Sequence, residues 1–178
     1  MAVGDTDLST CSIRATISAI LGKVFDLRTA TDVVNVTGSM TLSDGTGANA
    51  GNQQWTDQRT LASGANEELD MYGTLTNAFG DVINFARVRC IFIRNLSTTD
   101  TLLIGGAASN AFSTMFASAT DILVLRPATS AQQSFVLLCG PDATGYVVAT
   151  GTGDKLKIAH GSTTSTSLSY DVTIIGEV

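Results

Sequence analysis

Glycine-rich segments are the first residues in this chain whose types and spacing could do chemistry. The run "LLIGGAASNAF" (102–112) places Gly105 and Gly106 directly after a strand-like segment, and "GTGANAG" (45–51) is a second such run. A phosphate-binding loop needs GxxxxGK[ST] followed by a helix whose N-terminus meets the phosphates. Neither run has that lysine, a following helical pattern or the dinucleotide motif GxGxxG. We therefore predict tight bends, and at Gly105-Gly106 a close approach of another backbone, from the same fold or from a neighbouring subunit.

Nucleophilic and metal chemistry have few residues to use. His160 is the single histidine, in the segment "IAHGS", which we expect to be an exposed loop, and there is no GxSxG motif. A Ser/His/Asp or Cys/His site would have to use this residue. One histidine and three scattered cysteines do not have the ligand spacing of a zinc site. Short acidic loops could hold a Ca²⁺ between them, but aspartate as an ordinary turn residue is the favoured interpretation.

The segment "NEELD" offers a carboxylate pair. Glu68 and Asp70 share one face if the segment is a strand, which could suit glycoside hydrolysis. One Trp and three Tyr are a poor supply of sugar-stacking surfaces. A solvated edge or a salt-bridge patch is the favoured interpretation. We expect neither a catalytic site nor a cofactor, and we predict that the protein is not an enzyme.

Three arginines are the candidate partner-contact residues. In a strand, Arg87 and Arg89 point to one side and Arg94 points to the other. Guanidinium groups on a surface of low charge can dock acidic groups of a partner in a bidentate manner. Cross-strand pairing within the domain is the competing interpretation.

The composition narrows the class of protein. The chain has 178 residues, of which 15% are charged, 25 are Thr and 16 are Ser, and its net charge is −6. A duplex nucleic-acid binder needs many Lys and Arg to displace counterions, so nucleic acid is not an expected partner. The low charge and abundant hydroxyl groups favour an all-β domain with a largely covered surface or a place in an assembly.

The three cysteines are odd in number and none lies in a CxxC pair. Cys90 and Cys139 both lie in apolar runs, so we expect small buried side chains, with a Cys90–Cys139 bridge as an alternative. The acidic start "MAVGDTDLST" does not resemble a signal peptide, and the uncharged stretches are too polar to span a bilayer. The sequence predicts a soluble product of the cytoplasm.

Short apolar segments separated by turn residues predict one domain, 1–178, an antiparallel β-sandwich of roughly eight to ten strands. The segment 81–96 is the strongest strand signal, and we expect it to form a hairpin with 101–105. The segment "CSIRATISAILGKVFDL" fits both helical and strand spacing, and the all-β context favours a strand. Residues 1–30 are therefore expected to form either an N-terminal arm or a first strand.

Several phrases carry a resemblance: "WTDQRTLASGANEELDMYGTLTNAFGDVINFARVRCIFIRN", "IGGAASNAF", "PDATGYVVATGTGDKLKI" and "SYDVTIIGEV". Over about residues 52–178 the chain resembles short virion structural proteins of tailed bacteriophages. The resemblance implies a jelly-roll-like sandwich that acts as a capsid decoration or cement protein. It would bind the outer capsid surface and stabilise neighbouring capsomers, with the major capsid protein and copies of itself, in trimers, as partners. A tail, baseplate or fibre component is the alternative. Neither role implies a membrane or a small-molecule substrate.

Overall fold

The computed structural model describes residues 8–162 and 166–178, and in these ranges all regular structure is β. The predicted all-β class is confirmed. The strands are β1 Thr10–Val24, β2 Thr29–Ser43, β3 Gln53–Leu61, β4 Asn66–Asp70, β5 Tyr72–Thr76, β6 Val82–Asn84, β7 Arg87–Asn95, β8 Leu102–Gly105, β9 Ile122–Leu125, β10 Ser134–Cys139, β11 Tyr146–Val147, β12 Lys155–His160 and β13 Leu168–Glu177.

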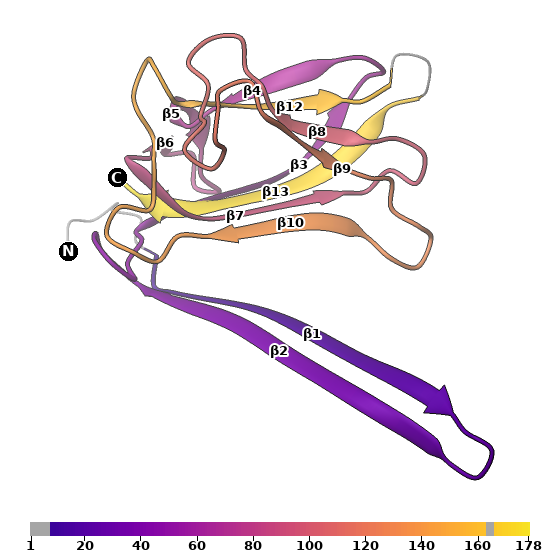
Figure 1. Cartoon of the computed structure of the whole chain (residues 1–178). Helices are drawn as coiled ribbons and strands as arrows, with labels where there is room; N and C mark the ends of the chain where they lie inside the picture. Colours follow the sequence, from indigo (N-terminus) through magenta and orange to yellow (C-terminus); the bar gives the residue numbers. More distant parts are fainter. Residues whose placement is uncertain (1–7, 163–165) are drawn as a thin grey trace.

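Two antiparallel sheets pack face to face and form most of the body, which also contains the short antiparallel pair β5–β6 (Figure 1). The first has the strand order β10-β7-β13-β3, with β11 paired to one end of β7, and the second has the order β4-β12-β8-β9. The core lies between them, because alternate residues of facing strands point inward. Ile91, Ile93 and Ile174 supply it from the first sheet, and Leu156 and Ile158 supply it from the second.

The predicted hairpin between 81–96 and 101–105 is wrong. The strand β7 has β10 on one edge and β13 on the other, so no edge is left for β8, which pairs with β9 and β12 in the second sheet. The buried Asn95 redirects the chain where β7 ends. Its side-chain amide donates 2.9 Å to the carbonyl of Asp100, and its Oδ1 accepts from the amide of Ser97.

The bend at Gly105-Gly106 is confirmed. Their φ angles are 103° and 68°, in the region that favours glycine. A Cβ added at Gly105 would lie 2.5 Å from the carbonyl oxygen of Asp121, so the backbone that approaches here belongs to the same chain. Phe112, which follows the bend, is buried in the core.

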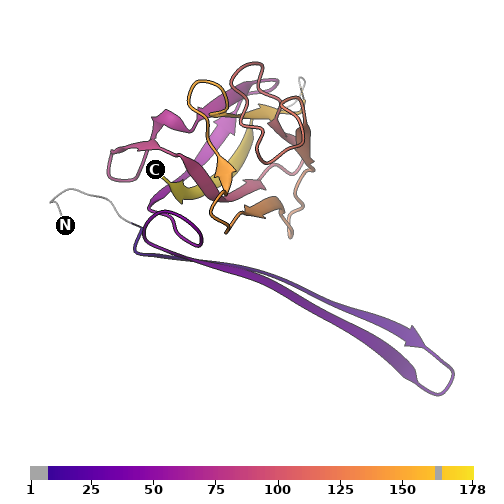
Figure 2. The same cartoon turned by 60° about the vertical axis from the view of Figure 1, so that its left-hand side comes forward.

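The N-terminal strand is confirmed, but the projecting element is longer than the predicted 1–30. The strands β1 and β2 form a hairpin that extends away from the body (Figures 1 and 2). We call residues 10–43 the arm. Its register runs without a break from the Thr10–Ser43 pair to the Val24–Thr29 pair near the tip.

Candidate protein-interaction surface

The arm has one mainly apolar face, where Asp32 is nevertheless paired with Leu21, and one mainly hydroxylated face, which carries the exposed pair Ile20–Val33 towards the tip. Directly paired residues of antiparallel strands share a face, and faces alternate along each strand. The apolar face, which we call the stripe, contains Cys11, Ile13, Ala15, Ile17, Ala19 and Leu21 of β1 and Val34, Val36, Gly38, Met40 and Leu42 of β2. On the other face the hydroxyls of Thr16 and Thr37 lie 3.2 Å apart, and Ser18 donates 2.8 Å to Asn35.

The base of the stripe packs against the body, and the rest is exposed. Met40 and Leu42 are buried beside Cys90 and Ile175 of the first sheet. Farther out, the exposed fractions of Ile17 and Leu21 are 67% and 74%. The stripe is therefore one continuous apolar surface of which only the inner part finds a partner within its own chain.

Such an arm is an unusual feature in a monomer. An isolated two-stranded hairpin is at best marginally stable in water, and exposed apolar patches commonly mark interaction sites. The chain exposes 10024 Å². A compact monomer of 18.5 kDa would expose about 8,200 Å². The arm contributes to this excess because both of its faces lie outside the body, and we therefore take it as the candidate interaction element.

A groove opens where the arm diverges from the first sheet. Its volume is about 820 Å³, and its floor is the outer face of the sheet, where Phe92, Phe135 and Leu137 lie. The rings of Phe92 and Phe135 are 5.7 Å apart, and the exposed fraction of Phe135 is 57%. Ile13 and Ile17 of the stripe line the opposite side. The body thus presents a second surface next to the first, which is apolar at Phe92, Phe135 and Leu137 and polar where Arg94, Gln133 and Thr173 lie.

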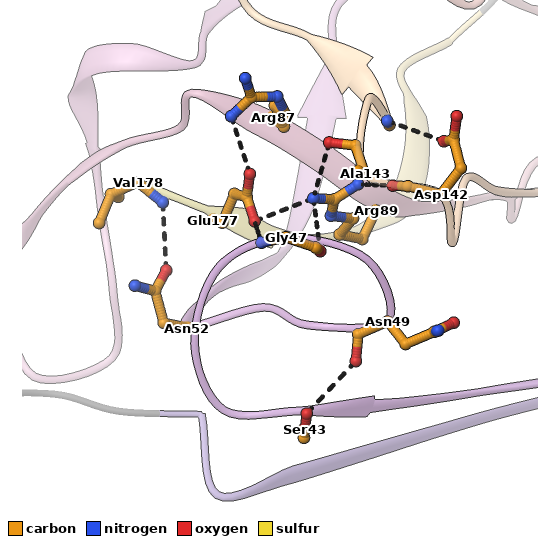
Figure 3. A network of polar contacts seen from close by, with 11 residues as sticks. Ser43, Gly47, Asn49, Asn52, Arg87, Arg89, Asp142, Ala143, Glu177 and Val178 are labelled. Atoms are coloured by element: carbon orange, nitrogen blue, oxygen red, sulfur yellow. Dashed lines mark hydrogen bonds and ion pairs between the residues drawn. The ribbon is translucent and has the colours of Figure 1, made fainter.

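A buried ion pair holds the arm to the body (Figure 3). The loop 44–52, which connects β2 to β3, places the backbone of Gly47 against Arg89 and Glu177. Arg89 Nη2 donates 2.7 Å to the Gly47 carbonyl, and the Gly47 amide donates 2.6 Å to Glu177 Oε2. Arg89 Nη2 lies 2.9 Å from the same carboxylate oxygen. The loop is thereby fixed between a cation and an anion from two central strands.

Backbone bonds add to this anchor. The amide of Asn49 donates 2.8 Å to the carbonyl of Pro141, and the amide of Asn52 donates 2.9 Å to the carbonyl of Gly176. Asn52 Oδ1 in turn accepts from the amide of Val178. The direction of the arm is therefore set by the body and not by the hairpin alone.

The anchor shifts the titration of Glu177. Burial by itself raises the pKa of this carboxyl group. Hydrogen bonds from Arg89, the Gly47 amide and Arg87 outweigh that effect, so the pKa lies below its ordinary value of 4.5. The ion pair is therefore retained in mildly acidic solution.

The three predicted partner-contact arginines are all ion-paired within the chain. Arg89 is fully buried against Glu177, and Arg87 lies 2.9 Å from the other oxygen of that carboxylate. Arg94 is on the outer face of the sheet, where Nε donates 2.9 Å to Asp171. Arg87 and Arg94 remain partly exposed, so a contact with a partner stays a prediction for these two. The burial of Arg89 places it outside any such surface.

Two predictions about single residues are wrong. His160 was expected in an exposed loop, but it is buried at the end of β12, where it continues the inward alternation of Leu156 and Ile158. Its Nδ1 accepts from the amide of Ser162. Cys139 was expected to be buried, but it is exposed because β10 is an edge strand and Cys139 points outward. The sequence also predicts a turn at "HGSTTSTS" (160–167), of which residues 163–165 lie outside the described residues.

The other candidate residues are placed as follows. Cys90 is buried as predicted, and it lies directly opposite Cys139 with both thiols free. Glu68 bonds to Lys155 at 3.0 Å, which is the salt-bridge interpretation of the "NEELD" segment. A pocket of about 280 Å³ at the base of the arm is lined by Leu8, Ser9, Thr10, Asn52, Gln53, Gln54, Thr56, Asn77, Ala78 and Phe79, none of which is ionisable near neutral pH.

Two features are absent from the described ranges, 8–162 and 166–178. In this part of the chain no three His, Cys, Asp or Glu side chains gather in a way that could hold a metal ion. Nor does it contain a helix of the length and apolarity needed to cross a membrane.

Comparison with known proteins gives no relative: no family model, curated protein or solved structure matches the chain. Sequence reasoning found the strand alternation of Ile13, Ala15 and Ile17 but missed the interaction surface. The signal was present, because Val34 and Val36 repeat the same alternation on the next strand and share a face with it.

Proposed function

We propose that this protein is a non-enzymatic structural component of a bacteriophage virion that decorates the outer capsid surface. The observation that carries the proposal is the projecting arm, whose apolar stripe continues past its own body. A subunit that functions alone gains nothing from such a surface, whereas a subunit of an assembly can bury it. The resemblance of several sequence segments to virion proteins of tailed phages is the reason for proposing that this assembly is a phage particle.

The chemistry of the body supports the same role. The carboxylates of Glu67, Glu68 and Glu177 are bound to basic side chains of the same chain, which is the arrangement of structural salt bridges. The polar outer positions of β3 and β13 carry hydroxyl pairs such as Thr56–Thr173 and Thr60–Ser169. A protein added in many copies to a lattice gains affinity by multivalency, so each copy needs a modest contact.

The partners in this proposal are the major capsid protein and other copies of this chain, arranged as trimers. The protein would stabilise neighbouring capsomers by bridging the seams between them. A jelly-roll strand connection, which the resemblance implies, is part of the proposal and not of the observed fold.

Copy number on purified particles tests the proposal. Quantitative mass spectrometry of virions should find this chain in numbers comparable to the capsomers, and antibody labelling should decorate heads. A few copies per particle, or labelling confined to the tail, would contradict a capsid role.

Heads prepared without the protein give a second measurement. They should lose DNA at a lower temperature and after milder dilution into low salt, and adding purified protein back should restore the wild-type resistance. Heads that are equally resistant with and without it would exclude a cement role.

A further inference from the structure

We propose that the stripe of one copy docks into the groove of a second copy, so that subunits exchange arms. This inference concerns association of the chain with itself and does not depend on the virion role. Two apolar surfaces have no partner within the described part of the chain: the outer part of the stripe and the apolar part of the groove floor. In the proposed contact, each of them binds the other surface of the second copy.

Both surfaces are rich in apolar side chains. The stripe presents aliphatic side chains that include Ile17, Leu21 and Val36. The groove floor offers the aromatic pair Phe92 and Phe135. Hairpin and sheet can pack face to face at the usual separation of about 10 Å between sheets, with apolar side chains interdigitating.

The chain already contains a contact of this kind. At the base of the arm, Met40 and Leu42 of the stripe pack on Cys90 and Ile175 of the same sheet face, with Leu137 beside them. The proposed contact extends this layer, because the arm of the second copy would lie beside the base of the first, over the apolar part of the floor at Phe92, Phe135 and Leu137.

The arm cannot fill its own groove. The fifteen-residue register from Thr10 to Val24 has no bulge. A sharp bend in a two-stranded ribbon normally needs one, or a glycine with positive φ. Gly22 and Gly38 of the arm do not have such a φ. The tip therefore stays away from its own sheet, as both views show (Figures 1 and 2).

Surface area favours a second copy as the partner. One chain exposes roughly 1,800 Å² more than a compact monomer of its mass, whereas a standard interface buries roughly 800 Å² on each partner. The excess surface of one chain is therefore large enough for a stable contact with a second copy. The arm, residues 10–43, carries three basic and two acidic side chains and the rest of the chain seven basic and fourteen acidic ones, so net charge does not oppose this contact.

Light scattering coupled to gel filtration of the purified full-length protein is the first test. The wild type should elute as a closed oligomer. Leu21→Asp with Val36→Asp, two stripe positions that do not line the groove, should raise the dissociation constant at least about 30-fold, because charges would enter the apolar contact. The matched control is Ser18→Asp with Thr37→Asp, which puts the same charges on the hydroxylated face and should leave the oligomer intact.

The groove has its own pair of variants. Phe135→Asp should dissociate the oligomer to the same extent, whereas Thr60→Asp, on the polar side of the same sheet face, should not. All these positions are exposed, so each variant should keep the far-ultraviolet circular dichroism and the unfolding midpoint of the isolated subunit.

Mixing the two dissociated variants distinguishes arm-in-groove docking from pairing of two stripes. The Phe135→Asp subunit retains an intact arm, and the Leu21→Asp/Val36→Asp subunit retains an intact groove, because neither of its changed residues lines the groove. The mixture should therefore form heterodimers, while neither variant associates alone. A monomeric wild type at high micromolar concentration, an oligomer insensitive to either set of changes, or a mixture that stays monomeric would overturn the inference.

Discussion

Arg89 and Glu177 form an ion pair that is closed to solvent: their side chains are 0% and 2% exposed, and Nη2 lies 2.9 Å from Oε2. Between them they hold the backbone of Gly47 at both its amide and its carbonyl. Since Gly47 lies in the loop that follows the arm, one buried pair couples the central strands of the body to the projecting hairpin (Figure 3).

Glu177→Gln should strongly destabilise the fold. The change leaves the Arg89 cation buried without its anion, and breaking a buried pair in this way commonly costs about 3–5 kcal/mol. Urea unfolding followed by tryptophan fluorescence measures it, because Trp55 lies in the core. Glu68→Gln, which removes a partly exposed pair with Lys155, is the control and should leave the midpoint unchanged. Equal unfolding midpoints for the two variants would contradict a stabilising role of the Arg89–Glu177 pair.

The stabilisation that the Arg89–Glu177 pair contributes should decrease as the pH falls. The pKa of Glu177 is lower in the folded protein than its ordinary value of 4.5, so its stabilising effect is complete above that pH. It is lost as the pH falls through the lowered pKa, where the carboxylate becomes protonated. The gap in unfolding free energy between wild type and Glu177→Gln should therefore close in strong acid. A gap that is constant from pH 7 to pH 2 would argue against this assignment.

Gly105→Ala should destabilise the protein by about 2 kcal/mol. The φ of 103° is unfavourable for alanine, and the new Cβ would meet the carbonyl of Asp121 at 2.5 Å. Gly22→Ala is the matched control, since a Cβ there has nothing within 4 Å. Thermal unfolding of both variants checks the difference, and a Gly105→Ala midpoint equal to that of the control would show that the bend tolerates a side chain.

One thiol should react much faster than the other two. Cys139 is exposed, whereas Cys90 is buried and Cys11 half-buried, and burial raises the pKa of both these thiols above the ordinary value. Because the thiolate is the reactive form, a thiol reagent at pH 8 should modify one equivalent quickly and the others only after denaturation. Cys139→Ser should abolish the fast phase. Three equal rates would contradict the burial of Cys90.

Local patterns made much of the body predictable. The strict alternation in "KLKIAH" and "SYDVTII" predicts two strands, and these segments form β12 and part of β13. Ion pairing within the domain was foreseen as an alternative for Arg87, Arg89 and Arg94. What could not be foreseen was the partner of each strand: β7 pairs with β10, β11 and β13, all far along the chain, and not with its neighbour β8.

The sequence by itself determined the all-β class, the glycine bend at Gly105 and the apolar alternation of residues 11–21, because propensity, turn chemistry and side-chain period act over a few residues. The tertiary structure decided that His160 is buried, that Cys139 is exposed and that the pair of Arg89 and Glu177 clasps the loop after the arm. It also decided that the stripe, from Ile17 to the tip of the arm, extends away from the body of its own chain. Burial depends on which distant strands meet, and a local pattern states only that a face is apolar, not what covers it.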